Sequence, residues 1–289
     1  MSQAGPLSDF VQWRPAPPLR PYVAWYSGYR QAGVEPARHR GLPSPYLTMI
    51  VTLDDPLVVA AHPDPKTPAG RYGTLVGGLH TAPAIITHDG RQSGVQLALS
   101  PLGARTLLGL PAGELANADL DGTDVLGRFA VRLQERLLAG DGWADRFATL
   151  DSLLLARLDR ARAVRPEVAW AWRRLGATDG SVPVTELARE VGWSTRHLGQ
   201  RFRDEIGLSP KVAARVVRFD RTRRVLLRRA ANGEPLALAD VATAGGYYDQ
   251  AHLAREFREF AGCAPSRWLA EEFRNVQVMD SGDPEDFES

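Results

Sequence analysis

The last third of the chain contains one sequence pattern twice, and this duplication limits the structures that the chain can form. The shared positions are apolar residues, glycines, capping residues and a proline, in the same order in both copies. They are Leu187, Ala188, Gly192, Trp193, Ser194, His197, Leu198, Phe202, Gly207 and Pro210 in the first copy, and Val241, Ala242, Gly246, Tyr247, Asp249, His252, Leu253, Phe257, Gly262 and Pro265 in the second. The repeat predicts two similar supersecondary units.

Each copy predicts a helix, a tight turn and a second helix. The first helices are expected over residues 184–191 and 239–244. Each is followed by a glycine, which readily takes the left-handed conformation that ends a helix. Ser194 and Asp249 are then suited to cap a second helix, whose inner face has leucine and phenylalanine four residues apart. This order is typical of a helix-turn-helix.

The outer faces of the two second helices have side chains that can read DNA. Arginine pairs well with guanine edges and glutamine with adenine edges when they project from the start of such a helix. The same residue types also occur on ordinary solvated helix faces, so it is the duplication that favours DNA binding. The candidates for DNA contacts are Thr195, Arg196, Gln200 and Arg201 in the first unit and Gln250, Ala251 and Arg255 in the second.

A basic segment, residues 211–230, connects the two units. It has eight basic residues and one acid, Asp220, although the net charge of the whole chain is only +1. As a helix it would span about 30 Å, close to the ~34 Å between major-groove faces on one side of B-DNA. A stiff connector of this length would let a monomer enter two successive grooves. Its basic residues would add affinity by neutralising phosphates, although some must pair with acids or face away from DNA.

Residues 166–274 resemble the DNA-binding domain of AraC/XylS-type transcription regulators. The resemblance rests on the helix VAWAWRRL, on both units and their connector, and on the closing segment GYYDQAHLAREFREFAGCAPSRWL. It implies a regulator that binds double-stranded promoter or operator DNA with two recognition helices, and that has RNA polymerase as a partner. One departure is Ala213, which stands where the second unit has Trp268. We therefore expect different packing beneath the first unit.

The first hundred residues predict strands. Short β-branched or aromatic runs alternate with proline, glycine and aspartate, which is typical of a β-sandwich or barrel. The runs are PYVAWYSGY, SPYLTMIVTL, PLVVAA, YGTLVGGL, APAIIT and SGVQLALS. From Ser100 and Pro101 onward the spacing becomes helical, with helices expected over 101–110, 124–139 and 141–159.

The expected fold class is α+β with two domains. An N-terminal, mainly β sensor or dimerisation domain is predicted over 1–160, because the arginine-rich, apolar-poor residues 159–166 suit a domain boundary. An all-α DNA-binding domain with both helix-turn-helix units is predicted over 161–275. Residues 276–289 are predicted to be a disordered acidic tail, since the last ten residues include five acids and no basic residue.

The family resemblance also implies that the N-terminal domain is a sensor or dimerisation module with a cupin-like sheet structure. Its recurring signatures, RHRGLPSPYLTMIV, GGLHTAP and GVQLALSPLGAR, resemble an actinobacterial-type subgroup. A pocket lined by strands could place polar residues around a small-molecule effector. The candidates for effector binding are His39, Tyr46, His80, Arg91 and Gln96, with Arg38 and Arg40 beside them.

Other classes of protein fit the sequence less well. The histidines of the N-terminal half lack the H-x-H pairing with a downstream acid that a cupin metal site needs, and no G-x-S-x-G elbow or phosphate-binding glycine loop is present. Cys263, the only cysteine, lies within the second unit, so it suits neither a disulfide nor a methyl-accepting repair protein. We therefore expect no enzyme, no metal and no cofactor. No apolar run is long enough to span a membrane and no secretory signal opens the chain, which predicts a cytoplasmic protein.

Two functional interpretations stay open from the sequence. In the first, a small-molecule effector bound to the N-terminal domain controls DNA binding. In the second, DNA binding is independent of any ligand, and the N-terminal domain only forms a homodimer.

Overall fold

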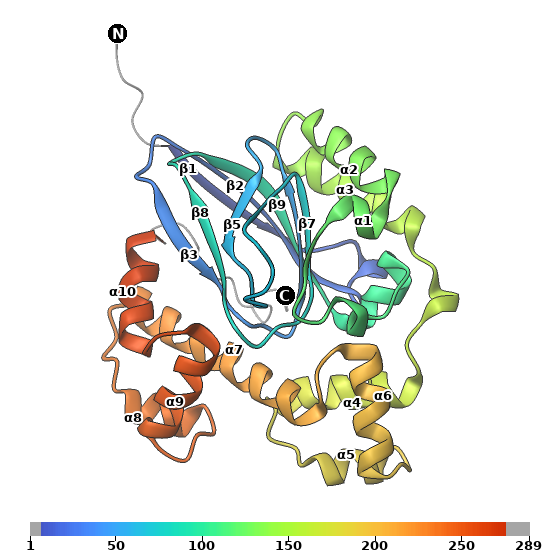
Figure 1. The fold of residues 1–289 in the computed structure, drawn as a ribbon, viewed down its shortest axis with the longest axis vertical. Coiled ribbons are helices and arrows are strands. Elements are labelled where there is room, and N and C mark those ends of the chain that lie inside the picture. The colour runs from blue at the N-terminus through green and yellow to red at the C-terminus, as the bar shows by residue number, and fades with distance from the viewer. Residues whose placement is uncertain (1–6, 276–289) are drawn as a thin grey trace.

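The computed structural model describes residues 7–275. A β-rich N-terminal region, residues 7–157, precedes a helical region, residues 166–275 (Figure 1). This arrangement confirms the predicted α+β fold class. The predicted acidic tail, 276–289, lies outside the described residues. None of the helices between residues 7 and 275 is long and apolar enough to cross a bilayer.

The strands of the N-terminal region form two antiparallel sheets that face each other. A six-stranded sheet has the order β1-β2-β9-β4-β7-β10, and a four-stranded sheet has the order β3-β8-β5-β6. Side chains such as Ile50 and Ile86, one from each sheet, pack together in the space between them. The strands are β1 (Leu7–Trp13), β2 (Val23–Ala32), β3 (Ala37–Gly41), β4 (Leu47–Thr52), β5 (Leu57–Ala61), β6 (Gly70–Tyr72), β7 (Thr74–Gly77), β8 (Ala84–His88), β9 (Gln92–Leu99) and β10 (Asp119–Asp121).

Helices α1 (Gly122–Leu126), α2 (Arg128–Leu138) and α3 (Trp143–Arg157) lie on the same side of the N-terminal region, at the six-stranded sheet (Figure 1). The buried face of α2 has Phe129, Leu133 and Leu137 at four-residue intervals, as an amphipathic helix requires. The single helix predicted over 124–139 is wrong, because Gly127 has a φ of +57° and separates α1 from α2. The helix predicted over 101–110 is also wrong: Pro101–Gly103 is a 3-10 turn and Ala104–Leu108 a single π-helical turn.

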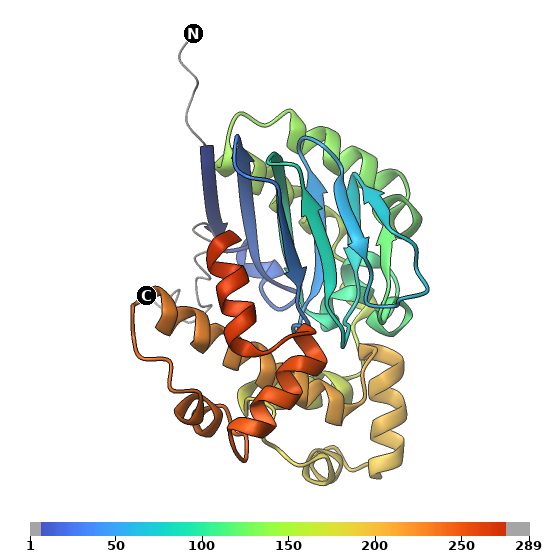
Figure 2. The same ribbon diagram turned by 60° about the vertical axis from the view of Figure 1, so that its left-hand side comes forward.

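The helical region has seven helices among the described residues. They are α4 (Pro166–Ala177), α5 (Val184–Glu190), α6 (Thr195–Ile206), α7 (Pro210–Ala231), α8 (Leu238–Ala244), α9 (Gln250–Ala261) and α10 (Pro265–Asn275). The connector predicted over 211–230 is one continuous helix, α7. Figure 2 shows α10 rising beside the strands, so the helical region does not merely follow the sheets but packs against them. One cluster of buried apolar side chains continues from the N-terminal region into the helical region.

The contact between β2 and α3 depends on a glycine. The indole ring of Trp143 lies over Gly28, where a Cβ atom would come within 2.3 Å of the ring, and the indole Nε1 donates a hydrogen bond to Asp9 at 2.6 Å. A side chain at position 28 must therefore displace the ring or the helix.

We expect Gly28→Val to lower the free energy of unfolding by about 1–3 kcal/mol, the usual cost of overpacking a filled site. Urea denaturation of the purified chain measures this change. Gly176→Ala is a matched control, because a Cβ atom there meets nothing within 4 Å. The control should leave stability unchanged or slightly higher, and an equal loss in both variants would contradict the packing argument.

Candidate nucleic-acid interface and cavity

The first helix-turn-helix unit consists of α5 and α6. Gly192 ends α5 with a φ of +72°, and the Ser194 hydroxyl accepts a hydrogen bond from the His197 backbone N–H at 3.2 Å, which caps α6. Leu198 and Phe202 on the inner face of α6 are fully buried. The aromatic neighbour of Phe202 is Trp172 of α4, with ring centroids 6.2 Å apart. The turn, the cap and the buried face of this unit follow the sequence prediction.

The second unit, α8 and α9, repeats this construction. Gly246 also has a φ of +72°, and the Asp249 carboxylate accepts a hydrogen bond from the His252 backbone N–H at 2.6 Å. Here the aromatic neighbour of Phe257 is Trp268 of α10, with ring centroids 5.3 Å apart. The packing beneath the two units therefore differs, as the Ala213 departure predicted.

Both unit histidines pack within their own units. The His197 ring lies edge-on to Trp193 with centroids 4.6 Å apart, and the His252 ring lies edge-on to Tyr247 with centroids 5.2 Å apart. The ring of His252 also accepts a hydrogen bond from the Tyr248 backbone N–H. These contacts fix the turn before each second helix.

All of the residues predicted to contact DNA are exposed. They are Thr195, Arg196, Gln200 and Arg201 on α6, and Gln250, Ala251 and Arg255 on α9. The Gln200 amide donates to Asp204 at 2.8 Å, so one of its hydrogen-bonding groups is engaged within α6.

The two second helices have the same polarity relative to the N-terminal region. Gly207, directly after α6, lies against Ala116, and Gly262, directly after α9, lies against Pro83. The C-terminal ends of both helices therefore face the N-terminal region, whereas Thr195 and Gln250 at their first turns lie about 18 Å away along each helix. Figure 1 shows α5 and α8, the first helices of the two units, on the side of α7 that faces away from the strands.

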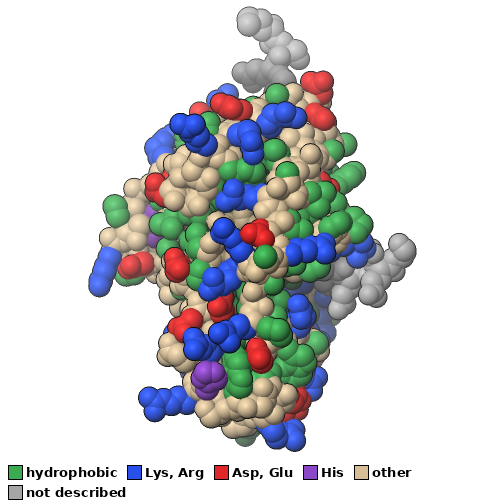
Figure 3. Space-filling view, turned by 90° about the vertical axis from the view of Figure 1, so that its right-hand side faces the viewer, with side chains coloured by type: hydrophobic (Ala, Val, Ile, Leu, Met, Phe, Trp, Pro, Cys, Tyr) green, Lys and Arg blue, Asp and Glu red, His purple; other side chains and the backbone are tan. Residues whose placement is uncertain are grey.

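The basic residues of α7 are mostly committed to partners within the protein. Arg215 and Arg218 bind the buried carboxylate of Glu256, and Arg221 lies 2.9 Å from Asp179. Three more arginines also have acidic neighbours: Arg223, Arg224 and Arg229. On the face drawn in Figure 3, Lys and Arg side chains are likewise interspersed with acids instead of forming one continuous patch. The expectation that some arginines of the connector pair with acids is therefore confirmed, and phosphate binding by the connector stays a prediction.

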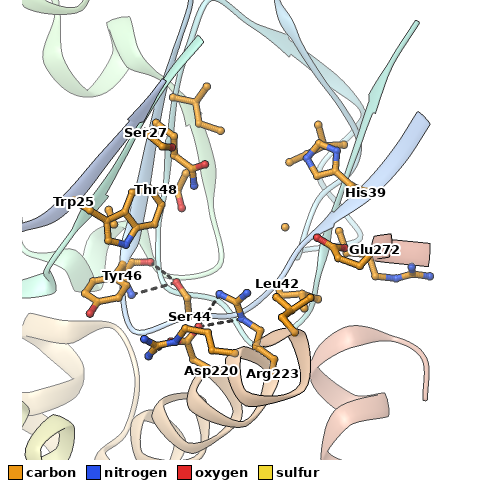
Figure 4. Close-up of a pocket in the computed structure, with 18 of the residues that line it drawn as sticks. Trp25, Ser27, His39, Leu42, Ser44, Tyr46, Thr48, Asp220, Arg223 and Glu272 are labelled. Carbon is orange, nitrogen blue, oxygen red and sulfur yellow. Dashed lines mark hydrogen bonds and ion pairs between the residues drawn. The ribbon is translucent and has the colours of Figure 1, made fainter. Parts of the chain in front are cut away.

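A cavity of about 240 Å³ lies between the two sheets and reaches the helical region (Figure 4). One wall is the six-stranded sheet, where side chains at alternate positions point inward. Gln12, Ser27 and Gln96 are cross-strand neighbours on β1, β2 and β9, and they form a row of neutral hydrogen-bonding groups. Trp25 and Thr48 line the same wall, and His39 of β3 faces them.

The floor of the cavity belongs to the helical region. Asp220 of α7 is only 2% exposed, and its carboxylate lies 2.7 Å from Arg223 and 2.8 Å from Arg224. Glu272 of α10 also lines the cavity, and burial raises the pKa of its carboxyl group. A molecule in this cavity would therefore touch both regions of the chain.

Four of the five residues predicted to bind an effector line the cavity: His39, Tyr46, His80 and Gln96. Arg91 is not among the lining residues, because its guanidinium is exposed and pairs with Asp54 and Asp55. Sequence reasoning missed the floor residues and the row on the sheet. The signal available in the sequence was the two-residue period of a strand, which places Trp25 and Ser27 on one face of β2 and Tyr26 on the other.

His62, which is buried, lies in a separate group with Asp119 and Tyr72. The His62 Nδ1 lies 2.8 Å from the Asp119 carboxylate, and the Tyr72 hydroxyl lies 3.3 Å from Nε2 of the same ring. His62 is 5% exposed and is not among the residues that line the cavity. Among residues 7–275, no group of three or more His, Cys, Asp or Glu side chains could hold a metal ion.

Comparisons with known proteins match the two regions separately. The family described as "Helix-turn-helix domain" matches residues 187–271, and the family described as "Domain of unknown function (DUF6597)" matches residues 11–121. No curated protein matches the chain.

Three solved structures illustrate what the chain resembles. ToxT from Vibrio cholerae is 10% identical over 85% of this chain and 97% of its own, with a TM-score of 0.48. The C-terminal domain of AraT, a response regulator from Geobacillus stearothermophilus, is 18% identical over 42% of this chain and 93% of its own, with a TM-score of 0.34. The AraC-like transcriptional activator CuxR is 14% identical over 79% of this chain and 83% of its own, with a TM-score of 0.33.

The environment of His39 predicts a pH effect on stability. Burial and the neighbouring His88 lower the pKa of His39 from 6.5 to about 4. Between pH 6.5 and about 4 the unfolded chain binds a proton at His39 that the folded chain does not. The free energy of unfolding therefore decreases as the pH falls through this range. Because His39→Gln removes this group, the decline in unfolding free energy from pH 6.5 to 5 should be about 1–2 kcal/mol smaller than in the native chain. Urea denaturation at both pH values measures this. The control Gln96→Ala, which changes a cavity residue that has no titratable group, should keep the native decline.

Proposed function

We propose that the chain is an AraC-type DNA-binding transcription regulator, that its helices α6 and α9 read two successive major-groove segments, and that a small molecule bound in the cavity controls this activity. The match of residues 187–271 to the helix-turn-helix family supports the proposal. We propose the division of the chain near residue 160 as well, with RNA polymerase as a partner at the promoter.

The observation that carries the two-groove proposal is the common polarity of α6 and α9. Their first turns, which contain the base-reading candidates, both lie at the ends remote from the N-terminal region, where one duplex could approach both. Helix α7 has 22 residues and spans about 33 Å, close to the ~34 Å between successive major-groove faces on one side of B-DNA. The length of the connector therefore suits simultaneous entry of both helices.

The position of the cavity supports control by a ligand. A ligand can shift a conformational equilibrium only when its affinity differs between the two states. A molecule that contacts the sheet wall and the floor on α7 meets this condition, because any movement between the two regions changes its contacts. The wall offers hydrogen bonds and the ring of Trp25. Three arginines (Arg40, Arg223 and Arg224) line the cavity together with two carboxylates (Asp220 and Glu272), and this excess of positive charge favours an acidic group in the ligand. We therefore propose a small organic acid as the effector class.

The alternative is a ligand-independent regulator whose N-terminal region only forms a homodimer. Exposed apolar side chains on the outer helices favour it: Val131 and Leu138 on α2 are 46% and 51% exposed, and Leu155 on α3 is 38% exposed. The two proposals differ in what changes the state of the protein, which is a ligand in one and the protein concentration in the other.

We expect Arg196→Ala to weaken binding to the specific duplex by about 1–3 kcal/mol while binding to random duplex changes little, because a base contact discriminates between sequences and a phosphate contact does not. Fluorescence anisotropy with a duplex selected by the native chain measures both affinities. Arg128→Ala, an exposed arginine on α2, serves as the control and should leave both unchanged. Equal losses on both duplexes would show that Arg196 contacts phosphate only.

We expect a member of a panel of small organic acids to raise the melting temperature of the native chain, since a ligand of the folded state stabilises it. Ser27→Leu fills the wall of the cavity and should abolish the rise, whereas the control Arg91→Ala should keep it. A rise that persists in Ser27→Leu would place the ligand elsewhere. Dimerisation that increases with protein concentration, with no response to the panel, would favour the alternative.

A further inference from the structure

The N-terminal region contacts α6, the proposed first recognition helix, at the C-terminal end of that helix. The Arg105 guanidinium donates two hydrogen bonds to the Glu205 carboxylate, at 2.6 and 2.9 Å, and the Glu205 side chain is only 13% exposed. This bond is the main reason that the pKa of Arg105 is raised. Bidentate pairs of this kind fix orientation as well as distance. The pair therefore holds α6 in one direction relative to the N-terminal region.

A glycine brings the backbones together at the same contact. Gly113 lies so close to α6 that a Cβ atom there would be 2.2 Å from the Asp204 carbonyl oxygen and 2.9 Å from that of Arg203. Gly207, which ends α6 with a φ of +95°, meets Ala116 in the same way, with 3.0 Å between an added Cβ atom and the alanine side chain. The contact is thus a close fit of two main chains, supported by one ion pair.

The second recognition helix has a separate contact with the N-terminal region. Gly262, which ends α9, lies against Pro83. Directly after it, α10 packs along β3, where Arg40 forms an ion pair with Glu271; these two side chains are 16% and 22% exposed. The N-terminal region therefore holds the C-terminal ends of both recognition helices at once.

Between these contacts the two units leave an open groove. It is lined by Val182 and Pro183 before α5, by Lys211 on α7, and by His252 and Arg255 on α9. The units are therefore not closed onto each other along this groove. Their relative orientation depends on α7 and on the two contacts with the N-terminal region.

We propose that the N-terminal region is a brace that sets the spacing between the two recognition helices, and that Arg105 and Glu205 are positioning residues for DNA reading. The inference rests on the proposed reading of two major-groove segments. Neither residue has to touch DNA. Their pair holds α6 while the Arg40–Glu271 contact holds the second unit, so the distance between the two reading surfaces is fixed from outside the helical region.

The test measures tolerance of operator spacing. The native chain first selects a duplex from a randomised library. The two recognised segments of this duplex are then separated by one or two additional base pairs, each of which moves them apart by about 3.4 Å. The affinities of the native chain, Arg105→Ala and the control Arg91→Ala are measured on all spacings by fluorescence anisotropy. A structural role alone would lower affinity by one factor on every duplex, whereas a brace changes the ratio between spacings.

We expect the native chain and Arg91→Ala to prefer the selected spacing by about tenfold or more, and Arg105→Ala to lose most of that preference. The charge exchange Arg105→Glu with Glu205→Arg should restore part of it, because the pair is formed again with opposite polarity. Glu271→Gln tests the other contact independently, and it too should relax the preference. An unchanged ratio in both Arg105→Ala and Glu271→Gln, whatever their affinities, would overturn the brace.

The outcome separates this inference from the proposed function. A native chain that selects two segments, together with variants that keep its preference for spacing, would overturn the brace alone. A native chain that selects no specific duplex, or only one segment, would overturn the two-groove proposal and the brace with it. Thermal unfolding of each variant confirms that the comparison uses folded protein.

Discussion

The structure depends on α7 being buried on two sides at once. Phe219 lies in the core of the second unit, with its ring 5.0 Å from that of Phe257. The next residue, Asp220, is buried beneath the cavity, and a buried carboxylate is stable only when it is paired. Arg223 and Arg224, one turn further along, supply the pairing. Since adjacent positions of one helix support both the unit and the cavity floor, neither can move without the other.

This arrangement changes the role expected for the basic connector, α7. A count of charges along residues 211–230 favours a phosphate-binding rod, but the folded chain uses most of these arginines to hold its own acids. Glu256, which is 3% exposed on α9, binds both Arg215 and Arg218 and so ties the second unit to α7. The sequence-independent part of the proposed DNA affinity would therefore depend on fewer cations than the connector contains. The proposed base contacts of α6 and α9 would contribute a larger share accordingly.

The sequence predicted what local patterns determine and missed what depends on distant parts of the chain. Glycine after α5 and α8, the caps Ser194 and Asp249, and leucine and phenylalanine four residues apart are local signals, and all of them appear in the structure. The six runs predicted as strands also contain strands, but β1, β3, β6 and β10 were not predicted. Their sequences are less apolar, so their strand conformation depends on their partners. The helix predicted over 124–139 failed because Gly127 takes a positive φ that spacing alone does not reveal.

The residues that line the cavity were harder still to predict from local sequence patterns. Gln12, Ser27 and Gln96 are far apart in the sequence and become neighbours only through the register of β1, β2 and β9. The floor residues come from the other region of the chain altogether, so no pattern within the first hundred residues could indicate them. His39 and His80 were predicted as polar residues that a pocket lined by strands could place around an effector. Arg91 was predicted on the same ground and has a different role, as an exposed partner of Asp54 and Asp55.

Arg40 connects the proposed effector with the proposed brace. It lines the cavity and also forms the ion pair with Glu271 that holds the second unit. An acidic group in the cavity would compete with Glu271 for this guanidinium. Loss of Arg40 would not leave Glu271 without a partner, because Arg267 already donates to it at 2.8 Å. The release therefore costs less than breaking an isolated buried pair. The Arg105–Glu205 contact lies outside the cavity lining, so an effector would loosen the second unit while the first stays held.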